Sequence, residues 1–433
     1  MLFTGMLLTL ACTTDETPDT TDDDVVVDET LPTDDTGEAD EANIVEIAAD
    51  TPELSTLVDA VVAAGLDETL SAEGDFTVFA PTNEAFEALG VDLDTLEPEV
   101  LAEILTYHVI ADARVDSGSI PAIADSVADY TLFFDTTDGV MVNNATVIQA
   151  DVEASNGIVH VVDTVLLPPT IVDAAVYGGL NELVGAVTAA DPAVVDLLSS
   201  PGDYTVFAPT DDAFAAIADV ASTLDQAALT DVLSYHVFPA RVPSDAVPAM
   251  ADSALINAGG YGVTALFDTS DGVVINGYST VVIADIKTTN GIVHVVDSVL
   301  LPPNIVDHAV AAGLTSLLDT VGAANGDVAG SLTGPSSKTV FAPTNDAFAD
   351  IADVAATLNE NQLRKVLLYH VVPAYAASGD VTTGSVPTFL DDQTLDVVVD
   401  GGVFVNGAEV VIADVHATNG VVHIVDAVLI PEL

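Results

Sequence analysis

The stretch FTVFAPTNEAF, from Phe76 to Phe86, returns in this 433-residue chain as YTVFAPTDDAF from Tyr204 to Phe214 and as KTVFAPTNDAF from Lys338 to Phe348. In the first copy, Thr77 to Ala80 has the composition of a β-strand, and the proline that follows ends it. Thr82 can then cap a helix whose acidic first turn suits the helix dipole. We expect this stretch to be structural and to carry no chemistry. The chain therefore contains one structural unit three times.

A Tyr-His pair and an octapeptide, NGIVHVVD, recur in step with this stretch. Their first residues are Tyr107, Tyr235 and Tyr369 for the pair, and Asn156, Asn290 and Asn419 for the octapeptide, which reads NGVVHIVD in its third copy. The period is roughly that of a whole small domain and exceeds the ~20 to 50 residues of a solenoid repeat. The Asn-Gly dipeptide predicts a tight turn, and the apolar run after it predicts a central strand of a sheet.

Together these landmarks resemble the fasciclin (FAS1) domain family over residues 43–433. The resemblance implies the α+β class, with three tandem fasciclin-like domains, each a β-rich wedge or sandwich with packed helices. It also implies a non-catalytic adhesion or matrix-binding role, at the cell surface or outside the cell. The expected segments are a signal or lipobox-like segment at 1–12, a disordered acidic linker at 13–42, and domains at 43–169, 170–303 and 304–433.

Each unit begins with apolar residues spaced three and four apart, which predicts an amphipathic helix. In the first unit this pattern runs from Ile44 to Val62, and Gly65 ends it. The later half of each unit is strand-like, and DTTDG at 135–139 predicts a hairpin turn. That run is far shorter than a dedicated calcium loop, so we expect no calcium site there.

Two histidines of each unit fall in apolar stretches, and we expect all six to be structural core residues: His108, His160, His236, His294, His370 and His423. Two imidazoles and a carboxylate, such as His108, His160 and Asp163, form a known metal-ligand set. However, His160 and Asp163 are separated by an odd number of residues along a strand, so they point to opposite faces. The sequence therefore predicts neither a metal site nor a cofactor.

The chain is strongly acidic, with 69 Asp and Glu against 6 Lys and Arg and a formal net charge of -63. Nucleic acid is excluded as a partner, because a phosphate backbone is bound through Lys and Arg. Salt screens the self-repulsion of such a charge, which favours a salt-adapted protein. Simple solubility of an exported protein is the alternative explanation.

The sequence MLFTGMLLTLA at 1–11 is apolar and precedes Cys12, the chain's single cysteine. It resembles the end of a bacterial lipoprotein signal peptide, in which Cys12 would become the lipidated N-terminus. It departs from that pattern in having no Lys or Arg before the apolar run, and in having Thr9 where such signals usually have Leu. An ordinary secretory signal is the alternative. Residues 13–42, rich in Asp, Glu and Thr, predict a disordered tether that holds the domains at the outer surface of the cell envelope.

No short catalytic sequence such as G-x-S-x-G, H-E-x-x-H or a P-loop occurs, so we expect no enzyme activity. In animal fasciclin-type matrix proteins, an Asp-Ile pair before the last Asn-Gly turn contributes to receptor adhesion. The matching pairs here are Asp151-Val152, Asp285-Ile286 and Asp414-Val415. The alternative is that these aspartates only shape the turn, and both interpretations stay open. The expected partners are cell-surface or matrix polymers, either polysaccharide or protein. The alternative function is a structural envelope protein that binds carbohydrate or divalent cations.

Overall fold

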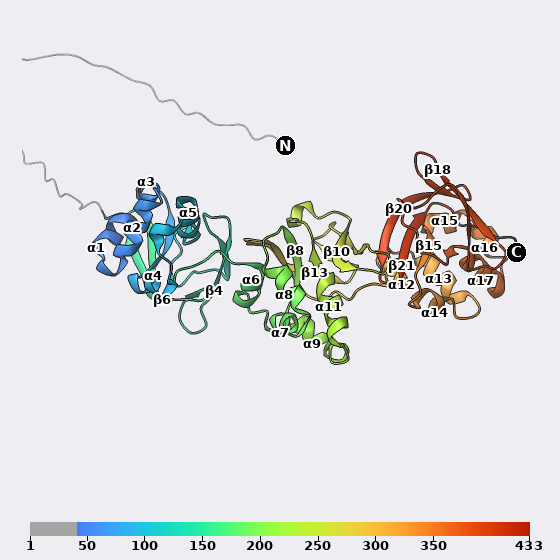
Figure 1. The fold of residues 1–433 in the computed structure, drawn as a ribbon, viewed down its shortest axis with the longest axis horizontal. Coiled ribbons are helices and arrows are strands. Elements are labelled where there is room, and N and C mark those ends of the chain that lie inside the picture. Colours follow the sequence, from blue (N-terminus) through green and yellow to red (C-terminus); the bar gives the residue numbers. More distant parts are fainter. Residues whose placement is uncertain (1–40) are drawn as a thin grey trace, which may run out of the picture. The chain divides into compact units, whose positions relative to one another are not determined.

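The computed structural model describes residues 41–433, in which three domains of the same architecture follow one another (Figure 1). The predictions for Cys12 and for most of the acidic linker lie outside the described residues. Each domain contains one seven-stranded sheet and a set of short helices. The predicted α+β class with three similar domains is confirmed.

The helices of the first domain lie before and between the first strands of its sheet. They are α1 (Ile44–Asp50), the 3-10 helix η1 (Pro52–Leu54), α2 (Ser55–Ala63), α3 (Asp67–Ser71), α4 (Asn83–Leu89), η2 (Leu93–Thr95) and α5 (Pro98–Tyr107). The single helix predicted from Ile44 to Val62 is therefore divided, because Pro52 starts a new helical segment and cannot donate to the preceding turn. Thr82 caps α4 as predicted, since its hydroxyl accepts the Ala85 N–H.

The sheet of the first domain has the strand order β2-β1-β7-β6-β5-β4-β3. Its strands are β1 (Phe76–Pro81), β2 (Val109–Ile110), β3 (Ile123–Asp125), β4 (Thr131–Asp135), β5 (Met141–Val142), β6 (Ala145–Ala154) and β7 (Gly157–Val162). Strand β1 is parallel to β7, and the other neighbours are antiparallel. Every residue of β7 is buried, as expected for a central strand.

The second and third domains repeat this order, with an additional helix after α9 and after α15. The second contains α6 (Ile171–Tyr177), α7 (Asn181–Ala189), α8 (Pro192–Ser199), β8 (Tyr204–Pro209), α9 (Asp211–Ala216), α10 (Ala218–Ala221), α11 (Gln226–Tyr235), β9 (Val237–Phe238), η3 (Ser244–Ala246), β10 (Met250–Ile256), β11 (Gly262–Asp268), β12 (Val274–Ile275), β13 (Ser279–Thr288) and β14 (Gly291–Val296). The third contains α12 (Ile305–Ala311), α13 (Thr315–Ala323), α14 (Val328–Thr333), β15 (Lys338–Pro343), α15 (Asn345–Asp350), α16 (Ala352–Ala355), α17 (Glu360–Tyr369), β16 (Val371–Val372), β17 (Gly384–Pro387), β18 (Thr394–Val399), β19 (Val403–Val405), β20 (Ala408–Ala417) and β21 (Gly420–Val425).

The Asn156-Gly157 dipeptide lies at the start of β7, and its contacts explain why Asn-Gly recurs in each domain. The Asn156 side chain accepts the Ile44 N–H at 3.0 Å and donates to the carbonyls of Leu70 and Ala72 at 2.7 and 2.9 Å. It thus joins α1 and the end of α3 to the sheet. A Cβ on Gly157 would lie 2.2 Å from the Phe76 carbonyl oxygen, so only glycine allows β1 and β7 to pair at this point. Asn290-Gly291 and Asn419-Gly420 make the same contacts in their own domains.

Each domain has apolar cores on both faces of its sheet. In the first domain, Leu57, Leu105 and Val159 belong to the core between the helices and the sheet, and Phe79 and Tyr107 belong to the core on the other face. Among residues 41–433, none of the helices has the length and apolar character needed to cross a bilayer.

Candidate functional site

The three candidate aspartates lie at the same irregular point of the long strand before the Asn-Gly turn. Asp151, Asp285 and Asp414 lie where the pairing register of β6, β13 and β20 shifts, and their φ angles are 59°, 59° and 61°. This left-handed conformation is unfavourable for most residues with a Cβ, and Asp tolerates it better than most. Each domain therefore carries an aspartate at a β-bulge.

A serine from a neighbouring loop binds each of these carboxylates through two hydrogen bonds. Asp151 accepts from the backbone N–H of Ser117 at 2.7 Å and from its hydroxyl at 2.5 Å. Ser244 makes the same pair of bonds to Asp285, at 2.8 and 2.5 Å. Ser378 binds Asp414 in the same way. In the first domain, both hydrogen bonds lower the pKa of Asp151, because they favour the ionised carboxylate. The bond from the Ser117 hydroxyl has the larger effect, and the bond from the Ser117 N–H has the smaller one.

A buried histidine of the next strand accepts a hydrogen bond from the backbone of each bulge. The N–H of Asp151 donates to Nδ1 of His160 at 3.3 Å, and the equivalent distances to His294 and His423 are 3.1 and 3.2 Å. Nε2 of His160 lies 2.9 Å from the Val115 carbonyl, so Nε2 carries the proton and Nδ1 accepts. Burial lowers the pKa of His294 and of His423, which keeps both imidazoles neutral.

Ser, His and Asp are the residue types of a catalytic triad, but their connections differ here. In a triad, the histidine accepts the serine proton and the carboxylate orients the imidazole. Here the Ser117 hydroxyl donates to Asp151, while both nitrogens of His160 are bonded to the backbone. The arrangement holds a loop and a bulge in place, and it does not connect the Ser117 hydroxyl to the His160 imidazole as a triad would.

The second member of each candidate pair faces inward. Ile286 and Val415 are buried in the helix-facing cores of their domains, and Val152 packs against the corresponding core of the first domain. The Asp151 side chain, in contrast, retains 40% of its surface exposed. Asp285 and Asp414 are half-buried, so in each pair the aspartate is the more accessible residue.

Sequence reasoning missed the serines that bind these aspartates. Ser117, Ser244 and Ser378 lie 34 to 41 residues before their partners in the sequence. The available signal was a serine that recurs in the loop after each Tyr-His pair. That signal is weak, because serine is common in loops for many reasons.

The other three histidines cap the helices that precede the second strand of each sheet. His108 follows the last residue of α5, where its Nδ1 donates to the Ile104 carbonyl at 2.7 Å and its Nε2 accepts the Leu166 N–H at 2.9 Å. His236 and His370 make the equivalent pairs of bonds. Burial lowers the pKa of all three to about 4, so they are neutral at pH 7. Within residues 41–433, no three His, Cys, Asp or Glu side chains are grouped as metal ligands.

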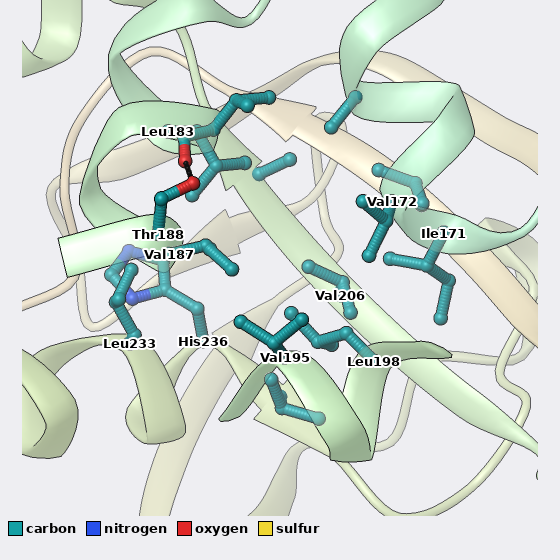
Figure 2. Close-up of a pocket in the computed structure, with 15 residues that line it drawn as sticks. Ile171, Val172, Leu183, Val187, Thr188, Val195, Leu198, Val206, Leu233 and His236 are labelled. Carbon is teal, nitrogen blue, oxygen red and sulfur yellow. Dashed lines mark hydrogen bonds between the residues drawn. The ribbon is translucent and has the colours of Figure 1, made fainter. Parts of the chain in front are cut away.

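Each domain also has an apolar pocket between its helices and its sheet. The pocket of the second domain, shown in Figure 2, encloses about 90 Å³ and is lined by Ile171, Leu183, Val206 and His236, among others. Both nitrogens of His236 are already bonded, and the Thr188 hydroxyl donates to the Val184 carbonyl. The pocket therefore offers little to orient a ligand, since specific sites combine apolar walls with a few free polar groups.

Comparison with known proteins identifies the class. The Fasciclin domain family model matches the chain at residues 52–168, 178–302 and 312–431, so this chain belongs to the fasciclin family, as its sequence predicted. Human periostin is 25% identical over 394 residues, which cover 88% of this chain and 46% of periostin. Protein sll1483 of Synechocystis is 54% identical over 136 residues, which cover 29% of this chain and 73% of that protein.

Two further similarities concern one protein named for the cell surface and one described as a cell adhesion molecule. Cell surface glycolipoprotein MPB83 of Mycobacterium bovis is 40% identical over 134 residues, which cover 28% of this chain and 59% of that protein. A solved FAS1 domain pair from the insect cell adhesion molecule Fasciclin I covers 58% of this chain and 97% of its own, with a TM-score of 0.38 and 21% identity.

Proposed function

We propose that this chain is a non-catalytic, multivalent adhesion protein of the cell surface, whose three domains each present one aspartate at a β-bulge. Its partner is a cell-surface or matrix polymer, either polysaccharide or protein. Membership of the fasciclin family supports this function, and so does the similarity to a cell surface glycolipoprotein.

One observation carries the proposal: the same Asp, Ser and His arrangement occurs in all three domains. A carboxylate has about four acceptor positions, and the serine uses two of them. The remaining positions of Asp151, Asp285 and Asp414 can accept hydrogen bonds from sugar hydroxyls or amides of a partner. Ser117 and its equivalents fix the direction of these acceptors, so less entropy is lost on binding.

Three sites on one chain bind a repetitive polymer by avidity. Linked sites can exceed the affinity of a single site by ~10² to 10⁴ when their spacing fits the target. Because the chain carries a net charge of -63, close approach to an acidic polymer requires salt or divalent cations. We therefore expect adhesion to rise with ionic strength when the polymer is acidic.

The test replaces Asp151, Asp285 and Asp414 together with asparagine, which keeps their size and their tolerance of positive φ. We expect the folded variant to lose at least tenfold in adhesion to cells or polysaccharide-coated surfaces. The matched control changes the same charge at one exposed position of each domain, as Glu87→Gln, Asp219→Asn and Asp353→Asn. The control should adhere like the wild type.

Unchanged adhesion of the folded variant with asparagine at positions 151, 285 and 414 would place the binding surface elsewhere. Equal losses in both variants would show that net charge, and not the turn, decides adhesion. Binding of a neutral polysaccharide only in the presence of calcium, at a salt concentration that already screens the charge, would favour the alternative function, a divalent-cation-binding envelope protein.

We further propose that Cys12 is lipidated and anchors the three domains at the outer surface of the cell envelope. The apolar residues before Cys12 and the acidic residues after it support this proposal. Cys12→Ala should move the protein from the membrane fraction to the medium, and mass spectrometry should find an acyl chain only on the wild type. Retention of the Cys12→Ala protein in the membrane fraction would contradict the proposal.

A further inference from the structure

Consecutive domains contact each other at two joints, the first between domains one and two and the second between domains two and three. Equivalent positions of the chain form both joints, but the side chains at these positions differ. At the first joint, Phe133 of β4 packs against Tyr177, the last residue of α6, with ring centroids 6.1 Å apart. At the second joint, the equivalent positions are Leu266 of β11 and Ala311, the last residue of α12. The equivalence is structural, because the N–H groups of Phe133 and Leu266 donate to matching asparagine side chains at 3.0 Å.

The loss of these two aromatic rings is accompanied by a cavity of about 410 Å³ at the second joint. Its walls are largely apolar and come from both domains, among them Met250, Leu266, Phe267, Ala311, Ile412 and Val415. Ligand sites of this size, ~300 to 1,000 Å³, occur preferentially at domain interfaces.

A histidine with an unused acceptor lines the same cavity. His308 is 1% exposed, and its Nε2 lies 3.1 Å from the His416 carbonyl, so Nε2 carries the proton. Nδ1 is then an acceptor, and among the described residues it is the one buried side-chain nitrogen or oxygen without a hydrogen-bond partner. The second domain has Ala174 at this position and the first has Ile47, so the histidine occurs where the aromatic pair is absent.

We propose that this cavity binds a small aromatic alcohol. Its ring would occupy the space that Phe133 and Tyr177 fill at the first joint, and its hydroxyl would donate to Nδ1 of His308. An unpaired buried acceptor is costly, and a ligand O–H removes that cost. The exposed carboxylate of Asp268 borders the cavity, and the chain is acidic throughout, so aromatic carboxylates are disfavoured. This proposal is independent of the adhesive function.

The test measures binding of 4-fluorophenol and of 4-fluorotoluene, which lacks the donor, to the three-domain chain by ¹⁹F NMR. The ¹⁵N resonance of His308 Nδ1 is followed in the same titration. We expect 4-fluorophenol to bind and to shift this resonance. His308→Ala, which introduces the residue found at position 174, should weaken 4-fluorophenol about tenfold and 4-fluorotoluene less than twofold.

A second variant fills the cavity with the pair that packs at the first joint. Leu266→Phe combined with Ala311→Tyr should abolish binding of both probes while the thermal unfolding of the chain is retained. The proposal is overturned if neither probe binds the wild type at millimolar concentration, or if binding persists in the filled variant. It is also overturned if 4-fluorophenol leaves the Nδ1 resonance unmoved, which would show that its hydroxyl does not donate to His308.

Discussion

At residue 156, one buried side chain joins segments that are more than 80 residues apart in the sequence. Asn156 satisfies the Ile44 N–H and two carbonyls at the end of α3, and its bonds to Ile44 and Leu70 are buried in the first domain, whereas Ala72 is exposed. A buried polar group that loses its partner costs ~1 to 3 kcal/mol. The recurrence of Asn290 and Asn419 follows from the same need in the other two domains.

We expect Asn156→Ala to lower the unfolding free energy of the first domain by about 3 kcal/mol, since it leaves the buried Ile44 N–H and Leu70 carbonyl without partners at once. Urea unfolding followed by NMR signals of each domain measures this loss. Asn144→Ala, at an exposed position of the same domain, is the control and should change stability by less than ~0.5 kcal/mol. Equal effects of the two variants would contradict the role given to Asn156.

At the scale of elements, three buried histidines follow α5, α11 and α17, and each connects its helix to the segment after the last strand of the same domain. His108 bridges α5 and Leu166, and His236 and His370 make the same connection in their domains. Burial lowers the pKa of each to about 4, whereas an unfolded histidine titrates near 6.5. The unfolded chain therefore binds more protons between these two pH values.

It follows that stability is fully present above pH ~6.5 and is lost as pH falls from ~6.5 towards 4, by at most ~3 kcal/mol for each of these histidines. Urea unfolding between pH 4.5 and 7 measures the slope. His370→Gln should reduce that slope for the third domain and leave the slopes of the other two unchanged. A third domain whose stability is constant over this range in the wild type would refute the prediction.

For the whole molecule, the two joints share one backbone contact and differ in their side chains. The N–H of Lys287 donates to the Thr131 hydroxyl at 3.0 Å, and the N–H of His416 donates to the Thr264 hydroxyl at 2.9 Å. Lys287 then forms salt bridges at 2.8 and 2.6 Å to two aspartates of the first domain. The His416 ring instead stacks on Tyr261, with centroids 4.7 Å apart.

We expect Lys287→Gln to weaken the first joint by about 1 kcal/mol, because it removes two partly exposed salt bridges to Asp125 and Asp129. NMR relaxation should then show faster independent tumbling of the first domain, with the second and third unchanged relative to each other. Lys365→Gln, an exposed position in the third domain, gives the same change of charge and should have no effect. Identical relaxation of the Lys287→Gln protein and the wild type would show that these salt bridges do not hold the joint.

The sequence by itself determined the three domains, their family, the helix cap at Thr82 and the central closing strand. These features depend on local rules of spacing and capping, and their threefold repetition made them readable. It did not reveal the break at Pro52, although proline was visible, because the apolar spacing continues across it. Of the candidate site, the positions of Asp151, Asp285 and Asp414 were predicted, but the serines that bind them were not.

The tertiary structure alone decided which distant groups meet. Ser117 reaches Asp151, Asn156 reaches Ile44, and Ile286 points into its core only because a bulge shifts the strand register. The cavity beside His308 is lined by residues of the second and third domains that lie far apart in the sequence, from Ala249 to Ile424. Such contacts are set by how whole elements pack, and the energy of packing depends on side chains that no local pattern brings together.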